Sequence, residues 1–133
     1  MDALIAQLLH LAVAWTGYSE PASVPVVQVV SAEQMPCPCM GFFGYSMQIQ
    51  GYGATIELPA RLLLREDVDL SKPYGSSILL HELVHALQAQ QGPAQYGSTL
   101  WQRREHEAYQ VQFRFLRASG VALSGRSGMA RRE

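Results

Sequence analysis

The stretch SSILLHELVHALQ, residues 76–88, decides the fold of this chain. Its aliphatic residues recur at the spacing of a largely buried helix, the Ser76-Ser77 pair supplies hydroxyls typical of a helix N-cap, and Gly92-Pro93 stops the run. His81 and His85 are four residues apart, so on a helix they lie one turn apart on the same face. The stretch therefore predicts a central helix that holds two imidazoles close together.

A carboxylate stands beside the first imidazole and completes the pattern H-E-x-x-H, which is typical of zinc hydrolases. Two histidines at this spacing can each place a ring nitrogen ~2 Å from one Zn2+ ion. Glu82 points away from that position by about a quarter turn and suits a general base acting on water, whose pKa the ion lowers to about 7. The alternative is that His81 and His85 are ordinary histidines of a half-buried helix.

A catalytic zinc ion usually has three protein ligands and an open position for water, so a third ligand is expected elsewhere in the chain. The longer pattern H-E-x-x-H-x-x-G-x-x-H is absent, because Gln88 and Gln91 stand where its glycine and third histidine would be. Beyond His85 the chain has no Asp and no Cys. The remaining candidates are Glu105, His106, Glu107 and Glu133.

A second predicted helix, residues 101–116, ranks these candidates by the face on which each lies. Its apolar stripe contains Trp101, Ala108, Val111, Phe115 and Leu116. Glu105 falls inside or beside this stripe, Glu107 lies off one flank, and His106 is almost opposite. Glu105 is therefore the expected third ligand, and Glu107 is the alternative.

Together the two helices resemble the gluzincin branch of the zincin metallopeptidases. The resemblance rests on HELVHALQ at residues 81–88 and on EHEAY at residues 105–109. Gluzincins carry H-E-x-x-H on one helix and a Glu on the next, often written E-x-x-A-[DN]; its first Glu maps onto Glu105, whereas the N-E-A form would select Glu107. Tyr109 replaces the Asp or Asn, which implies a hydrogen bond to a ligand or a role at the substrate oxyanion. In size the chain is similar to the minigluzincins and to small uncharacterised bacterial proteins with H-E-L-V-H-x-L-Q.

The resemblance implies an α+β, zincin-like fold, in which a small, twisted, mainly antiparallel sheet packs on the H-E-x-x-H helix beside further helices. It also implies a zinc-dependent peptidase of peptide or protein substrates, with Glu82 and Tyr109 as catalytic residues. The alternative is a non-catalytic, zincin-like metal-binding or protein-interaction domain. In this fold the last strand before the active-site helix, Thr55 to Leu58 here, pairs with an extended substrate or is simply a core strand.

The remaining pattern indicates one domain, residues 1–119, followed by a flexible tail, 120–133. A helix from Leu4 to Trp15, ended by Gly17, is expected to dock on the core. Strands are predicted at residues 25–30, 45–50 and 54–58, and a short helical turn followed by a loop over 60–75.

Composition fits a soluble globular protein of 133 residues with a net charge of −1. That charge gives no electrostatic footprint for nucleic acid. No apolar run is long enough for a transmembrane helix, and no Lys or Arg precedes the N-terminal apolar stretch, as a signal peptide would require. A cytoplasmic protein and a mature exported domain both remain open.

Cys37 and Cys39, separated by one proline, are the only cysteines. Such a pair alone is a weak indicator of zinc binding. Free thiols, a small-ring disulfide and half of a second metal site are the alternatives. The family resemblance favours a loop disulfide and an exported setting.

Overall fold

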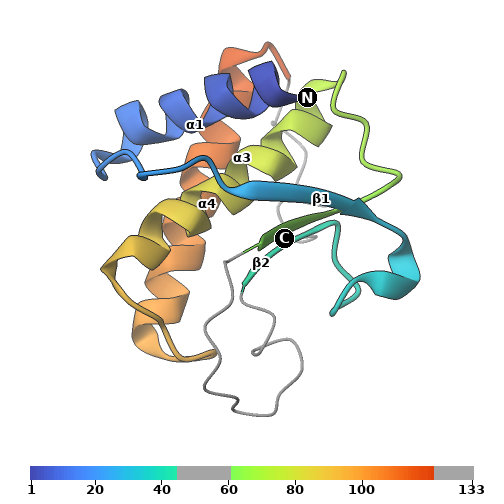
Figure 1. The fold of residues 1–133 in the computed structure, drawn as a ribbon. Coiled ribbons are helices and arrows are strands. Elements are labelled where there is room, and N and C mark those ends of the chain that lie inside the picture. The colour runs from blue at the N-terminus through green and yellow to red at the C-terminus, as the bar shows by residue number, and fades with distance from the viewer. Residues whose placement is uncertain (45–60, 122–133) are drawn as a thin grey trace.

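A computed structural model describes residues 1–44 and 61–121 of the chain. In this part the protein has an α+β fold, with three helices packed against a three-stranded sheet (Figure 1). The helices are α1 (Asp2–Thr16), α3 (Pro73–Gln88) and α4 (Thr99–Ala118). The strands are β1 (Val26–Val30), β2 (Gly41–Gly44) and β3 (Arg61–Arg65), and short 3-10 turns occupy η1 (Ala32–Gln34) and η2 (Ala89–Gln91).

The sheet is mixed, with the strand order β1-β3-β2. β1 runs parallel to β3, with Val26 opposite Arg61, and β2 runs antiparallel to β3, with Gly41 opposite Leu64. The predicted strand at 25–30 is thus confirmed as β1, whereas the described sheet is not mainly antiparallel. The strands predicted at 45–50 and 54–58, including the substrate-pairing strand Thr55 to Leu58, lie outside the described residues.

The helical turn predicted after residue 60 is wrong, because residues 61–65 form the central strand β3. Leu62 and Leu64 pack into the main core beneath the helices, while Leu63 faces the other side and packs with Val30 and Met35. Because β3 has a neighbouring strand on each side and is covered on both faces, it reads as a continuous apolar run rather than an alternating one. Such a short run cannot be distinguished from a buried helical segment by periodicity alone.

Helix α3 lies at the centre of the molecule, between the sheet and the other two helices (Figure 1). It begins at Pro73 and not at the Ser76-Ser77 pair, because proline fits the first helical position, where its missing N–H costs nothing. The two serines lie inside the first turns. The Ser76 hydroxyl donates to the Leu70 carbonyl at 2.9 Å, and the Ser77 hydroxyl donates to the Tyr74 carbonyl at 2.6 Å.

The predicted helices at both ends of the described chain are confirmed. Gly17, with φ +81°, ends α1 in the left-handed conformation, and its N–H donates to the Val13 carbonyl at 2.9 Å. Helix α4 is capped by Ser98, whose hydroxyl accepts from the Trp101 N–H at 3.1 Å. The boundary between a domain at 1–119 and a flexible tail stays a prediction, since residues 122–133 are not described.

Cys37 and Cys39 form a disulfide in the loop between η1 and β2. In this structure they are therefore neither free thiols nor metal ligands. Cys39 packs against the small apolar cluster of Val30, Met35 and Leu63 on the sheet face opposite the helices.

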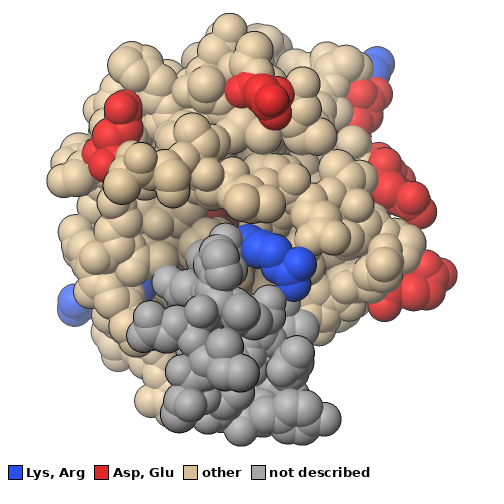
Figure 2. Space-filling view, viewed as in Figure 1, with Lys and Arg blue, Asp and Glu red and all other residues tan. Residues whose placement is uncertain are grey.

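On the face drawn in Figure 2, acidic side chains are spread over the described surface, with a few Lys and Arg among them. None of the helices in the described residues combines the length and apolarity needed to cross a membrane.

Candidate metal centre

The two histidines of α3 point toward the same place beside the helix. His81 and His85 are one turn apart, their ring centroids lie 4.9 Å apart, and their Nε2 atoms are 3.2 Å from each other. The His81 side chain is buried, and that of His85 is 20% exposed. The helix thus presents two ring nitrogens to one point near the surface of the core, as its sequence predicts.

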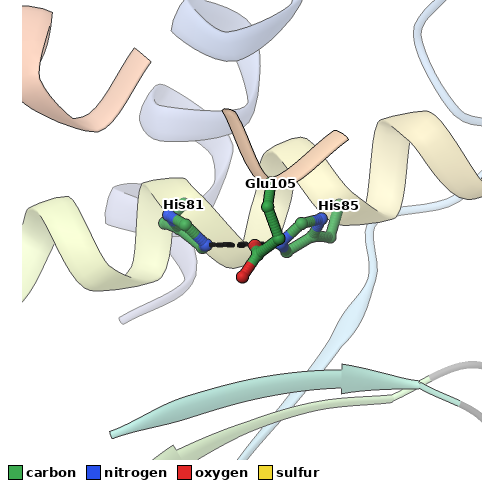
Figure 3. Close-up of side chains that lie close together, drawn as sticks. All are labelled: His81, His85 and Glu105. Atoms are coloured by element: carbon green, nitrogen blue, oxygen red, sulfur yellow. Dashed lines mark hydrogen bonds and ion pairs between the residues drawn. The ribbon is translucent and has the colours of Figure 1, made fainter. Parts of the chain in front are cut away.

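Glu105 of α4 places its carboxylate between the two imidazoles (Figure 3). Its Oε1 lies 3.1 Å from His81 Nε2 and 2.6 Å from His85 Nε2. One potential ligand atom from each residue lies within 4.8 Å of the other two, and among the described residues this is the only group of at least three such side chains that could hold a metal ion. The structure therefore brings together the three residues expected from the sequence.

The tautomer of His85 is fixed by the amide of Gln88. Gln88 Nε2 donates to the Arg104 carbonyl and to Glu107 Oε1, both at 2.9 Å, and neither of these oxygens has a proton to give. The amide oxygen must then face His85 Nδ1, which lies 2.8 Å away and donates to it. A neutral His85 consequently carries its lone pair on Nε2.

A similar chain of hydrogen bonds sets the tautomer of a neutral His81. The Ser77 hydroxyl gives its proton to the Tyr74 carbonyl and so acts as acceptor for Gln112 Nε2, at 3.2 Å. Gln112 Oε1 then accepts from His81 Nδ1 at 2.9 Å. In its neutral form, each imidazole therefore turns the lone pair of Nε2 toward Glu105.

When both imidazoles are neutral in these tautomers, three electron-pair donors meet at this point, an arrangement that a proton or a metal ion stabilises. Burial lowers the pKa of His85, but the hydrogen bond to Glu105 and the charges of Glu82 and Glu105 outweigh it, so that its pKa is raised. For Glu105, an acid, burial acts in the opposite direction and raises the pKa, but the hydrogen bonds to His81 and His85 lower it to about 2. Without a metal, the site attracts a proton; two imidazoles and one carboxylate also suit a divalent transition metal.

Glu82 of α3 is buried and faces β2, the outer strand of the sheet as far as the described residues show it. A Cβ built on Gly41 of β2 would stand 2.9 Å from Glu82 Cγ and 3.1 Å from Glu82 Oε2. The strand can pass this close to the carboxylate only because Gly41 has no side chain. The role of Glu82 as general base stays a prediction.

Tyr109 packs on the other side of the centre. Its ring lies 4.4 Å from the His81 ring, at an interplanar angle of 55°, and is stacked on Phe113 at 6.0 Å. The tyrosine thus helps to orient the His81 imidazole by contact. Its predicted catalytic role is untested.

Glu107, the alternative third ligand, does not join the group of His81, His85 and Glu105 in this structure. Its Oε1 accepts instead from the Tyr18 hydroxyl at 2.6 Å and from Gln88 Nε2. His106 is exposed on the outer face of α4, and Glu133 lies outside the described residues.

Sequence reasoning missed the groups that support the two imidazoles. Gln88 and Gln112 are buried, and the available signal was a polar side chain within an apolar stripe: Gln112 directly follows Val111 on the inward face of α4. Tyr18 gave no signal, because it is far from α3 and α4 in sequence.

Comparison of the chain with models of protein families, with curated proteins and with solved structures finds no match.

Proposed function

We propose that the protein is a zinc-dependent metallopeptidase of the gluzincin type. The observation that carries the proposal is the convergence of His81 Nε2, His85 Nε2 and Glu105 Oε1 on one partly buried point. The described residues offer three protein ligands, which would leave a position open, as catalytic zinc sites do and closed structural sites do not.

The residues around the point suit the hydrolysis of a peptide bond. A bound zinc ion would supply Lewis-acid polarisation of the attacking water and of the substrate carbonyl. Glu82, one residue after the first ligand, would accept the proton of the water and pass it to the leaving amine nitrogen. Tyr109, in contact with His81, is the candidate for stabilising charge on the carbonyl oxygen. Zinc, the catalytic roles and a peptide or protein substrate are all part of the proposal.

The presence of Glu82 beside the site favours an enzyme over a domain that holds a metal for stability or for binding a partner. A purely structural site has no use for a buried carboxylate that is not among its ligands. The zincin-like fold belongs to the same proposal, but β3, and not Thr55 to Leu58, is the last strand before α3.

The Glu82→Gln variant tests the proposal, because it keeps the size of the side chain and both imidazoles while removing the base. We expect elemental analysis to find zinc still bound, and cleavage of a broad peptide pool to fall by ~10²–10⁴-fold. Glu66→Gln, which neutralises an exposed carboxylate, is the matched control and should cleave like wild type.

Two results would contradict the peptidase proposal. One is a zinc-loaded wild-type protein that cleaves nothing in the pool, which would favour the non-catalytic alternative. The other is a Glu82→Gln variant that cleaves at the wild-type rate, which would remove Glu82 from the reaction.

A further inference from the structure

We propose that Glu107 is a positioning residue of the metal centre, which acts on His85 through Gln88. This inference rests on the metal site of the proposed function but does not require that the site be catalytic. In this inference Glu107 is not a metal ligand; it contacts Gln88 on one side and Tyr18, just after α1, on the other.

Gln88 is isolated from solvent. Its side chain is 1% exposed, so both amide protons and the amide oxygen must find partners within the protein. All three do: the protons go to the Arg104 carbonyl and Glu107, and the oxygen accepts from His85 Nδ1. All the hydrogen-bonding positions of the Gln88 amide are thus filled by protein groups.

The Glu107 carboxylate can only accept hydrogen bonds, and this helps to determine which way the Gln88 amide faces. If the amide were rotated by half a turn, its oxygen would face the Glu107 carboxylate and the Arg104 carbonyl, and its protons would face His85 Nδ1. Two acceptor pairs would then be in contact in a buried place, where an unsatisfied polar group costs roughly 1–3 kcal/mol. Glu107, together with the Arg104 carbonyl, thereby disfavours the orientation that would draw the lone pair of His85 to Nδ1, away from the candidate metal position.

Glu107 is itself held in place by Tyr18. The Tyr18 hydroxyl, just beyond the end of α1, donates to the same Oε1 at 2.6 Å. Burial and this hydrogen bond raise the pKa of Tyr18 to about 12, so the phenol keeps its proton and remains a donor over the whole neutral range. Tyr18 thus anchors Glu107 to the segment after α1, whereas the effect on His85 passes only from Glu107 through Gln88.

The competing explanation is that these hydrogen bonds only pack three helices together. Packing and positioning differ in one observable, the tautomer of His85 in the zinc-free protein at a pH at which the imidazole is neutral. Two-bond proton–nitrogen NMR correlations of the histidine rings identify the nitrogen that carries the proton. A loss of packing alone lowers stability without moving that proton.

Glu107→Leu and Gln88→Met are the test variants, since each removes the acceptor in question and keeps most of the side-chain volume. Gln110→Met, at an exposed position on α4, is the matched control for Gln88→Met. Tyr18→Phe is the structural control, because it takes a hydrogen bond from Glu107 but leaves Gln88 both of its acceptors. Binding of Zn2+ is measured by competition with a chromophoric chelator.

We expect wild type, Gln110→Met and Tyr18→Phe to hold the proton of His85 on Nδ1. In Glu107→Leu and in Gln88→Met, the Nε2-protonated tautomer should become populated, and Zn2+ affinity should fall by roughly 10–100-fold, as for other groups that orient metal ligands. Either variant decides the question if the other does not fold.

The inference is overturned if both folded variants keep the wild-type tautomer, or if Tyr18→Phe moves it as much as Glu107→Leu does. Failure of the proposed peptidase activity is a separate result, because the NMR measurement needs neither zinc nor a substrate. If wild type binds no Zn2+, the metal site is refuted while the tautomer still reports on Glu107.

Discussion

Replacing Gly41 by alanine should displace the proposed base without touching a metal ligand. The new Cβ would lie 2.9 Å from Glu82 Cγ and 3.2 Å from Ile78 Cγ2, whereas carbon atoms pack best at about 3.5–4.0 Å. Gly41 does not have a positive φ, so in open space an alanine there would stabilise the protein by roughly 0.4–1 kcal/mol. Overpacking costs about 1–3 kcal/mol, which outweighs that gain and makes the variant less stable than wild type.

The strain should be relieved mainly by Glu82, because the backbone of β2 is paired with β3 while a carboxylate side chain can turn. A displacement of about 1 Å at a reacting group can cost roughly 10²-fold in rate. We therefore expect Gly41→Ala to lower denaturant stability, to lower peptide hydrolysis by roughly that factor, and to leave zinc content unchanged.

Gly97→Ala is the control, since its Cβ would meet nothing within 4 Å but would sit at φ +80°. That variant should lose stability through its backbone and keep full activity. Gly41→Ala protein that is as stable and as active as wild type would refute the close approach of β2 to Glu82.

Three further results are expected. Glu105→Gln should weaken Zn2+ binding far more than Glu107→Gln in a chelator competition assay; the opposite ranking would make Glu107 the ligand. Zinc at about a hundred times its Kd should raise the free energy of unfolding by about 2.7 kcal/mol, and His81→Ala should abolish this response; a His81→Ala variant that is stabilised like wild type would refute the site. Because burial and the hydrogen bond to Glu107 raise the pKa of Tyr18 from 10.0 to about 12, its contribution to stability is present below pH 10 and lost as the pH rises toward 12. Phenolate absorbance should show a late-titrating tyrosine that disappears in Tyr18→Phe.

The grouping of His81, His85 and Glu105 could be predicted from the sequence because their geometry is local. His81 and His85 need only a helix to lie together, and Glu105 needs only a second helix whose inward face is known. The two helices themselves were recognisable from long apolar periodicity, the strongest signal that a single sequence offers.

The sheet and the supporting groups could not be predicted in the same way. Leu62 to Leu64 are strong helix formers, and only the two neighbouring strands make this segment a strand. The partners of Gln88 are fixed by the approach of α4 and of the segment after α1, which are contacts between residues distant in sequence. The close passage of Gly41 over Glu82 has the same origin, since it depends on where the edge of the sheet meets α3.

Nearly all of the centre is encoded in two consecutive helices, from Ser77 on α3 to Gln112 on α4. A protein designer could thus transplant the helical hairpin to another scaffold as one piece, carrying over the ligands, both glutamines, the Ser77 hydroxyl and Glu107. The recipient scaffold would have to provide an apolar surface on which α3 can pack and one tyrosine hydroxyl in the place of that of Tyr18. A recipient that also passes a glycine-bearing strand over Glu82 would receive the proposed general base along with the candidate metal site.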